Sequence, residues 1–267
     1  MANNKIIYNG NTLIDLTGDT AVAADVASGK TFHLADGTQA TGTASGGGGD
    51  TIYDIYNTTG ATYENNSMTT IPQYMFAYSK LATLTAPNVE SVGAYGLSNS
   101  KITSLSLPVC TDIASSACMQ CSSLTSIYLP EVLTLGANSF NFCSNLTSVS
   151  LPKATSVGYN SFSSNTKLEH ASLPKITTVT SSCFQSCSRL LDVEVGPVTS
   201  VAASAFKSCS ACLVFDFTRC TVVPTLANVS AFTGINANAQ IKVPASLETN
   251  WKTANNWNTY ASYIVGV

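Results

Sequence analysis

Between Thr70 and Pro224, aliphatic residues return at a fixed interval along the chain. The step between successive members is 21 residues twice and then 22 residues five times. A period of this length is typical of a solenoid, in which each repeat buries its apolar face only by stacking on its neighbours. The members of this column are Ile71, Val92, Ile113, Leu135, Val157, Val179, Val201 and Val223.

Each repeat opens with alternating apolar and polar residues, as in the segment from Leu124 through Ile127 to Leu129. This alternation predicts a short strand with one buried face. Proline then predicts the end of the strand, because it removes a backbone donor from the ladder. The prolines in this slot are Pro87, Pro108, Pro130, Pro152 and Pro174, and the later repeats carry Gly196 and Thr218 instead.

The second half of each repeat carries one large apolar residue that follows several small ones. Such a stretch favours about one turn of α- or 3₁₀-helix that packs tightly on the next repeat. We therefore expect these large residues to stack as the spine of the core. They are Phe76, Leu97, Cys118, Phe140, Phe162, Phe184 and Phe206.

The combined signature is L-x-x-I-x-L-P, then the aliphatic slot, then A/S-F-x-x-C-x-x-L. It resembles the leucine-rich repeats of the BspA type, which are found in bacterial surface proteins. The resemblance implies a horseshoe solenoid of short parallel strands and short helical or 3₁₀ turns over residues 69–240. It also implies a C-terminal cap over residues 241–267, in which Trp251 and Trp257 pack on the last repeat rather than form a ligand platform.

Residues 1–44 do not follow the repeat and predict a small β-rich module. Asp36-Gly37 between two β-like runs is a hairpin signal, and residues 23–26 favour one helical turn. The glycine-rich residues 45–50 predict a flexible linker. Residues 51–68 are interpreted as strands that cover the open face of the first repeat, or that contact another subunit.

The N-terminal motifs I-x-Y-x-G-x-x-L-I-D-L-T-x-D-T and G-K-T-x-x-x-x-D-G-x-x-x-T-G-T occupy residues 6–20 and 29–43. Together they resemble N-terminal segments of tail-associated structural proteins from phages and prophages of Gram-positive bacteria. The resemblance implies a module that docks on a virus particle. It names no functional residue that transfers to a position of this chain.

The composition argues against several classes of protein. Only 10% of residues are charged and the net charge is −3, which argues against a nucleic-acid surface. No apolar run reaches the length of a transmembrane helix, so no membrane insertion is expected. The first ten residues lack the apolar region of a signal peptide, and a virion protein released by lysis would not need one.

Nine cysteines are present, and four of them lie on the repeat at Cys121, Cys143, Cys187 and Cys209, with Asn165 in the vacant slot. We interpret them as reduced, packed thiols, because each falls on a position that packing already explains. A disulfide remains a less favoured alternative. A metal site is not expected, since histidine co-ligands are nearly absent, and no other cofactor is implied.

No sequence motif for catalysis is present, and only His33 and His170 are available as histidine bases. We therefore expect no enzymatic activity. The outward strand positions are more informative, because most carry small hydroxyls while the C-terminal ones turn acidic around Glu169 and His170. The acidic part is either a solvated face that discourages edge pairing or a site for a cation, a basic peptide or a hydroxyl-rich glycan. The candidate ligand-binding residues are Tyr128, His170, Asp192, Glu194 and Asp216.

These patterns lead to one functional hypothesis and two alternatives. The hypothesis is a phage or prophage tail protein, located in the virion, whose residues 1–68 contact other tail proteins and whose solenoid binds a host surface protein or glycan. The first alternative is an extracellular bacterial adhesin or interaction module, and the second is a structural virion decoration. Tail fibres are commonly trimers, so a homo-oligomer formed through residues 1–68 is a further expectation.

Overall fold

The computed structural model describes residues 5–8, 11–15, 31–33, 39–41 and 52–267. The chain divides into two compact units, residues 1–51 and 52–267. In the first unit, β1 (Lys5–Tyr8) pairs antiparallel with β2 (Asn11–Asp15). Strands β3 (Thr31–His33) and β4 (Gln39–Thr41) also pair antiparallel, as the hairpin signal between them predicted. The expected turn residues 36–37, the helical turn at 23–26 and the linker at 45–50 lie outside the described residues.

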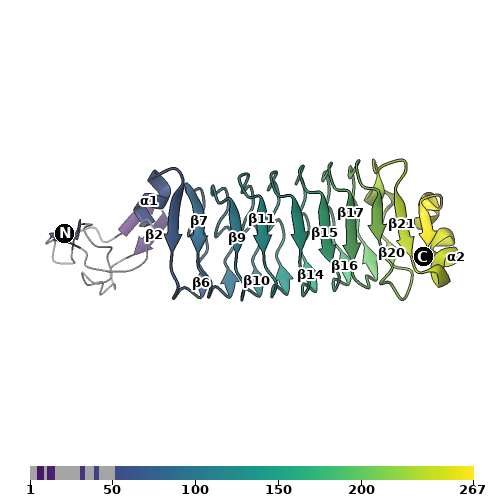
Figure 1. Ribbon diagram of the computed structural model, residues 1–267, viewed down its shortest axis with the longest axis horizontal. Coiled ribbons are helices and arrows are strands. Elements are labelled where there is room, and N and C mark those ends of the chain that lie inside the picture. The colour runs from purple at the N-terminus through teal and green to yellow at the C-terminus, as the bar shows by residue number, and fades with distance from the viewer. Residues whose placement is uncertain (1–4, 9–10, 16–30, 34–38, 42–51) are drawn as a thin grey trace. The chain divides into compact units, whose positions relative to one another are not determined.

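The second unit is a parallel β-solenoid of about nine coils, so the predicted fold class is correct. Figure 1 shows the coils following one another in sequence order. Each coil up to the one that contains β20 contributes one longer and one shorter strand. The longer strands are β5 (Ala61–Glu64), β7 (Leu81–Thr85), β9 (Ser104–Ser106), β11 (Ser126–Tyr128), β13 (Ser148–Ser150), β15 (His170–Leu173), β17 (Asp192–Val195), β19 (Val214–Asp216), β21 (Gln240–Val243) and β22 (Ile264–Gly266). The shorter strands are β6 (Thr70–Ile71), β8 (Ser91–Val92), β10 (Asp112–Ile113), β12 (Thr134–Leu135), β14 (Ser156–Val157), β16 (Thr178–Val179), β18 (Ser200–Val201) and β20 (Thr225–Leu226).

The aliphatic column of the sequence forms the buried positions of the shorter strands from β6 to β18. Its last member was predicted wrongly, because Val201 pairs with Leu226 and not with Val223. Val223 is only half-buried. The chain between β19 and β20 is longer than in the preceding coils, which moves the strand three residues towards the C-terminus.

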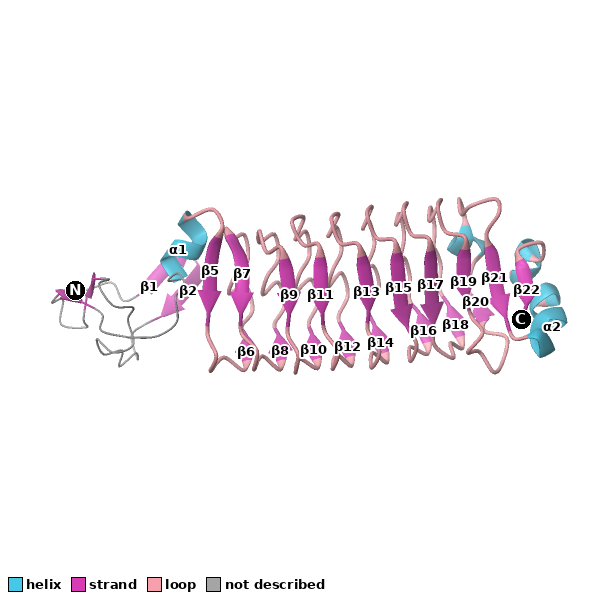
Figure 2. Ribbon diagram, in the orientation of Figure 1, coloured by secondary structure: helices cyan, strands magenta, loops and turns pink. Residues whose placement is uncertain are grey.

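The segments that follow β6 to β18 are turns and not the predicted helices, whereas the 3₁₀ helix η2 (Val229–Phe232) follows β20 as predicted (Figure 2). In one such segment, the backbone N–H groups of Asn138, Phe140 and Phe142 donate to carbonyl oxygens of the next coil, at 2.9, 2.9 and 3.0 Å. A helix needs those donors for bonds within its own segment. The inter-coil ladder uses them instead, so the chain advances as tandem turns.

The core is a single stack of side chains along the solenoid. Phe140, Phe162, Phe184 and Phe206 follow one another with ring centroids 5.5–5.8 Å apart and ring planes within 14° of parallel. This confirms the predicted phenylalanine column. The stack continues to Phe232, whose ring lies 5.2 Å from that of Phe206 and which the repeat pattern did not predict.

The N-terminal end of the solenoid is covered by one helix and one strand, where strands alone were expected. Helix α1 (Ile52–Asn57) buries Ile55, whose carbonyl accepts from the N–H of Lys80 at 2.6 Å. Strand β5 then pairs in parallel with β7, and Tyr63 packs against Phe76 at 5.1 Å. The first coil therefore does not expose its apolar face.

The C-terminal cap buries both tryptophans, as expected. Trp251 lies on α2 (Glu248–Thr253) and Trp257 on η4 (Trp257–Tyr260), with their rings 4.5 Å apart. Both rings also contact Phe217, and neither residue is exposed to solvent. The remaining short helices are η2 (Val229–Phe232) and η3 (Ala245–Leu247). Among the described residues, no helix is long and apolar enough to cross a membrane.

Candidate functional site: the strand face

The outward side chains of the longer strands form one continuous surface, which we call the strand face. Parallel pairing keeps equivalent residues in register, so each outward position becomes a column across the coils. The small hydroxyls and acidic side chains that the sequence analysis assigned to outward positions stand in two such columns. One column runs Ser104, Ser126, Ser148, His170, Asp192, Val214 and Gln240, and the other runs Ser106, Tyr128, Ser150, Ser172, Glu194, Asp216 and Lys242.

His170 and Asp192 face each other on neighbouring strands β15 and β17. The Nδ1 atom of His170 lies 2.6 Å from Oδ2 of Asp192, and both side chains are about half exposed. Ser148 occupies the same register position on β13, so serine, histidine and aspartate stand in one column. No hydrogen bond joins the side chains of Ser148 and His170, two residues that the structure describes. The column therefore lacks the nucleophile–base contact that a serine hydrolase requires.

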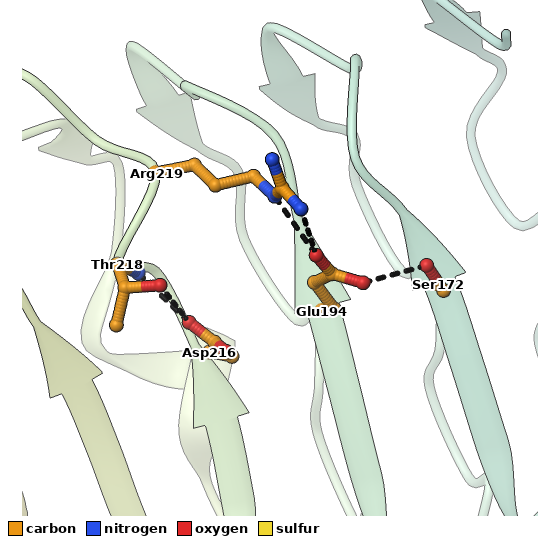
Figure 3. Close-up of polar contacts among 5 residues, drawn as sticks. All are labelled: Ser172, Glu194, Asp216, Thr218 and Arg219. Carbon is orange, nitrogen blue, oxygen red and sulfur yellow. Dashed lines mark hydrogen bonds and ion pairs between the residues drawn. The ribbon is translucent and has the colours of Figure 1, made fainter. Parts of the chain in front are cut away.

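Glu194 is held from both sides, as Figure 3 shows. Its Oε2 accepts a hydrogen bond from Oγ of Ser172 at 2.7 Å. Its Oε1 accepts from Nε of Arg219 at 2.8 Å and lies 2.6 Å from the second guanidinium nitrogen. Arg219 comes from the loop after β19 and not from a strand, so the sequence pattern did not associate it with the face.

Asp216 makes its hydrogen bonds to the turn that directly follows it in the sequence. Its Oδ1 accepts from both the backbone N–H and the hydroxyl of Thr218, at 2.9 and 2.7 Å, which fixes the turn after β19 (Figure 3). Lys242 is its register partner on β21. The predicted acidic patch therefore exists as a cluster, but Arg219 and Lys242 offset part of its charge. We call His170, Asp192, Glu194, Asp216 and Arg219 the carboxylate cluster.

Tyr128 is not part of this cluster. It is 58% exposed on β11, where its register partner is Ser106. In its own column, Ser150 and Ser172 separate it from Glu194. The structure thus brings together four of the five predicted site residues and leaves Tyr128 on a hydroxyl-lined part of the same face.

An open groove of about 600 Å³ lies beside the cluster, at the corner where the longer strands end. Of its lining residues, Pro174 comes from the proline slot, Pro197 lies one residue after that slot, and Arg219 is shared with the carboxylate cluster. The sequence analysis missed this groove, although the repeated proline slot followed by Lys153 and Lys175 was a visible signal. The lining residues are Thr155, Pro174, Lys175, Pro197 and Arg219.

All nine cysteines are buried and free. Within the repeat column, each thiol donates to a backbone carbonyl of the preceding coil, as from Cys187 to Phe162 at 3.0 Å and from Cys209 to Phe184 at 3.1 Å. Burial raises the pKa of Cys183 to about 12 and that of Cys110 to about 11. A thiol with so high a pKa is protonated near neutral pH and is therefore a weak nucleophile.

The described part of the chain contains no group of three or more His, Cys, Asp or Glu side chains arranged to hold a metal ion. The carboxylate cluster, for which the sequence analysis had named a cation as one possible ligand, is among the residues searched. The chemistry that the cluster offers is therefore charge-assisted hydrogen bonding to a ligand.

Stacked parallel strands, a phenylalanine spine and caps at both ends define a leucine-rich repeat solenoid. The family model described as BspA type leucine rich repeat region (6 copies) matches residues 53–153 and 111–223, which is more than half of the chain. The chain therefore belongs to the BspA-type leucine-rich repeat family. The fold is one that is typically non-enzymatic.

A comparison with solved structures found similar chains, and the first of these has the same fold. The leucine-rich repeat protein TpLRR of T. pallidum is 17% identical with a TM-score of 0.51, and the match covers 57% of this chain and 77% of that one. A leucine-rich cell surface protein from Faecalibacterium prausnitzii A2-165 is 18% identical with a TM-score of 0.44. That match covers 77% of this chain and 63% of the other. A leucine-rich repeat protein from Bacteroides ovatus is 16% identical with a TM-score of 0.33, covering 76% of each chain. A search of curated proteins found no match.

Proposed function

We propose that this protein is a non-enzymatic interaction module displayed on the outside of a bacterial cell. In this proposal, it binds a protein partner through the carboxylate cluster and the adjoining groove. The observation that carries the proposal is the alignment of His170, Asp192, Glu194 and Asp216 on three neighbouring strands, directly beside a groove that shares Arg219. The BspA-type family membership and a surface-protein relative support the location.

The rigidity of the scaffold favours binding. The side chains of the cluster project from strands that are fixed by parallel pairing on both sides. Glu194 is held further by Ser172 and Arg219, and Asp216 by Thr218. A preorganised surface loses little conformational entropy when a partner binds, so more of the contact energy contributes to affinity.

The charge balance favours a partner segment with basic side chains. Four carboxylates, those of Glu169, Asp192, Glu194 and Asp216, lie on or next to the face, while Arg219 and Lys242 are the fixed cations among them. The remaining negative charge attracts lysine and arginine side chains and aligns them before contact. The groove can then receive the backbone of the same segment.

Binding of a fluorescent oligolysine peptide tests the chemistry of this site. The triple variant Asp192→Asn, Glu194→Gln, Asp216→Asn removes charge and keeps the side-chain shapes, including the oxygen that caps Thr218. The matched control Glu64→Gln, Glu90→Gln, Glu131→Gln changes the net charge by the same amount elsewhere. We expect at least a tenfold loss of affinity in the first variant and less than threefold in the control. Equal losses in both would reduce the binding to net charge and refute the site.

The location has its own test. Protease treatment of intact cells that express the protein should degrade it if it is displayed outside, while a cytoplasmic marker survives. Recovery only in purified phage particles would instead favour the virion hypothesis. That second candidate rests on one observation, the separate N-terminal unit with its tail-like sequence motifs.

Self-association through residues 1–68 belongs to the same second candidate. Light scattering of the full chain and of a variant that lacks residues 1–51, the whole of the first compact unit, measures it directly. A trimer that becomes a monomer on truncation supports an attachment module. Monomers in both cases remove that support.

A further inference from the structure

The tandem turns give each coil two residues in the left-handed backbone region, four positions apart. Their φ angles fall between 53° and 62° in every coil from the first to the seventh. Side chains at these positions form what we call the turn face. The first position holds Tyr74, Tyr95, Ser116, Asn138, Asn160, Ser182 and Ser204, and the second holds Tyr78, Asn99, Gln120, Phe142, Ser164, Ser186 and Ser208.

Tyrosine is an unfavourable choice at these positions. Bulky side chains rarely adopt positive φ, whereas asparagine tolerates it because its short polar side chain bonds to nearby backbone. Most coils carry serine, asparagine or glutamine, but the first two coils carry Tyr74, Tyr78 and Tyr95. Backbone strain of this kind concentrates where a side chain is kept for binding.

These tyrosines are also grouped, and two of them are exposed while Tyr95 is partly buried. Tyr78 is 74% exposed and Tyr74 is 48% exposed. The rings of Tyr74 and Tyr95 stack with centroids 5.0 Å apart and planes 11° from parallel. Tyr56 of the N-terminal cap joins the group, since its hydroxyl donates to the carbonyl of Met75 at 2.7 Å.

Packing alone does not account for this arrangement. The core of the same coils is complete without the three rings, because Phe76 and Leu97 are fully buried beneath the turn face. In the stacked pair, Tyr74 is 48% exposed, and Tyr78 beside it is 74% exposed. Both therefore leave aromatic surface that a flat ligand ring can contact.

We propose that Tyr74, Tyr78 and Tyr95 form a binding surface for a neutral polysaccharide. A pyranose ring presents C–H groups on its faces, which the electron-rich face of an aromatic ring attracts, and hydroxyls around its edge. The rest of the turn face supplies matching hydroxyl and amide groups, and none of its fourteen left-handed positions is charged or aliphatic. An anionic polymer would need cations there.

The polymer runs along the solenoid in this arrangement. Successive coils repeat about every 4.8 Å, as neighbouring strands do. Asn99, Gln120 and Asn138 follow the tyrosines in the direction of the C-terminus, so sugar hydroxyls beyond the first ring meet side-chain amides. This site lies on different residues from the carboxylate cluster and does not depend on the function proposed for it.

Native gel electrophoresis of the full chain in gels that contain hydroxyethylcellulose, yeast mannan or a soluble β-glucan tests the proposal. We expect at least one of these polymers to slow the wild-type protein. The Tyr74→Asn, Tyr95→Asn variant should migrate as it does without polymer, and Tyr74→Phe, Tyr95→Phe should still be slowed because the rings remain. The control Leu133→Ser removes an exposed apolar side chain outside the turn face and should leave the retardation unchanged.

Thermal unfolding completes the test, because it shows whether a variant loses binding without losing stability. An asparagine relieves the backbone strain at a positive-φ position, so it should not destabilise the fold. We expect Tyr78→Asn to leave Tm unchanged or raise it by about 1–3 °C, while it weakens polymer retardation. Retardation that persists in the double asparagine variant overturns the proposal, as does retardation by none of the neutral polymers. Retardation only by polygalacturonate, an anionic polymer, overturns it equally.

Discussion

The side-chain amide of Asn165 donates a hydrogen bond to the carbonyl oxygen of Phe140, 25 residues earlier, at 3.1 Å. Thiols of other coils make the same contact, as from Cys143 to Cys118 at 3.1 Å and from Cys187 to Phe162 at 3.0 Å. One column of side chains therefore ties each coil to the carbonyl of the core residue in the coil before it. Asparagine replaces cysteine in this role once.

Replacement of Asn165 by cysteine should stabilise the protein. Asn165 is fully buried, and its Oδ1 atom has no hydrogen-bond partner. A thiol retains the donor to Phe140 and removes the unpaired acceptor, so we expect the free energy of unfolding to rise by about 1 kcal/mol. Urea unfolding measures it. Asn165→Ala, which removes the donor as well, should instead destabilise, and equal stability of both variants would contradict the role of this bond.

Truncation within the phenylalanine stack should be costly. Phe162 is fully buried between the rings of Phe140 and Phe184, so Phe162→Ala should lower the free energy of unfolding by about 3–5 kcal/mol. Phe142→Asn is the matched control, because Phe142 is 51% exposed and has positive φ. We expect a change within about 0.5 kcal/mol for the control. Comparable losses in urea unfolding would refute the stack as the main stabilising element.

The two cap tryptophans should respond differently to phenylalanine. The indole N–H of Trp257 donates to the carbonyl of Pro224 at 2.7 Å, whereas the indole nitrogen of Trp251 is buried without a partner. Both replacements lose similar volume, but only Trp257→Phe breaks a hydrogen bond. It should therefore cost about 1 kcal/mol more than Trp251→Phe, as measured by chemical unfolding. The reverse order would show that the cap is held by ring packing alone.

Alkaline pH should destabilise the protein through its thiols. Burial raises the pKa of Cys110 and Cys220 to about 11 and that of Cys212 to about 12, from an ordinary value of 9.0. Between pH 9 and the raised pKa of each thiol, the unfolded chain has lost protons that the folded chain retains. The free energy of unfolding therefore falls as pH rises above 9. Each such thiol contributes a slope of about 1.4 kcal/mol per pH unit. Stability measured from pH 7 to 10.5 checks this, with Cys110→Ala expected to reduce the slope.

The same burial predicts low thiol reactivity in the folded state. Iodoacetamide at pH 8 should leave the native protein unmodified over minutes, since all nine thiols are buried away from the reagent, and thiolate, the reactive form, is scarce wherever burial raises the pKa. In denaturant without reductant, mass spectrometry should count nine alkylated cysteines, in agreement with nine free thiols. Fewer than nine would reveal a disulfide.

Much of the solenoid could be predicted from the sequence, because its determinants are local. Alternation set which side of each strand is buried, and the 22-residue step placed the aliphatic column correctly as far as Val201. The prediction failed at Val223, where the chain between β19 and β20 is longer and Leu226 takes the position instead. A helix was expected around Phe140, but a single repeat cannot reveal that its N–H groups bond to the next coil.

The candidate site was predicted in part. Asp192, Glu194 and Asp216 stand on the expected face, in the expected order. Arg219 was missed because it lies in a loop, 25 residues after the glutamate that it contacts. Whether the cluster binds a ligand stays a prediction until the charge-matched variants are compared.

The sequence by itself determined that the chain repeats, which residues each repeat buries, and which columns line its outward face. These follow from the alternation of apolar and polar residues and from a fixed period, which act over a few residues at a time. The tertiary structure decided which charges meet, how Arg219 and Thr218 engage the carboxylates, and that the turns hold tyrosines at positive φ. Those features depend on how one coil is set against the next, and hydrogen bonds between coils fix that relationship across 20 or more residues.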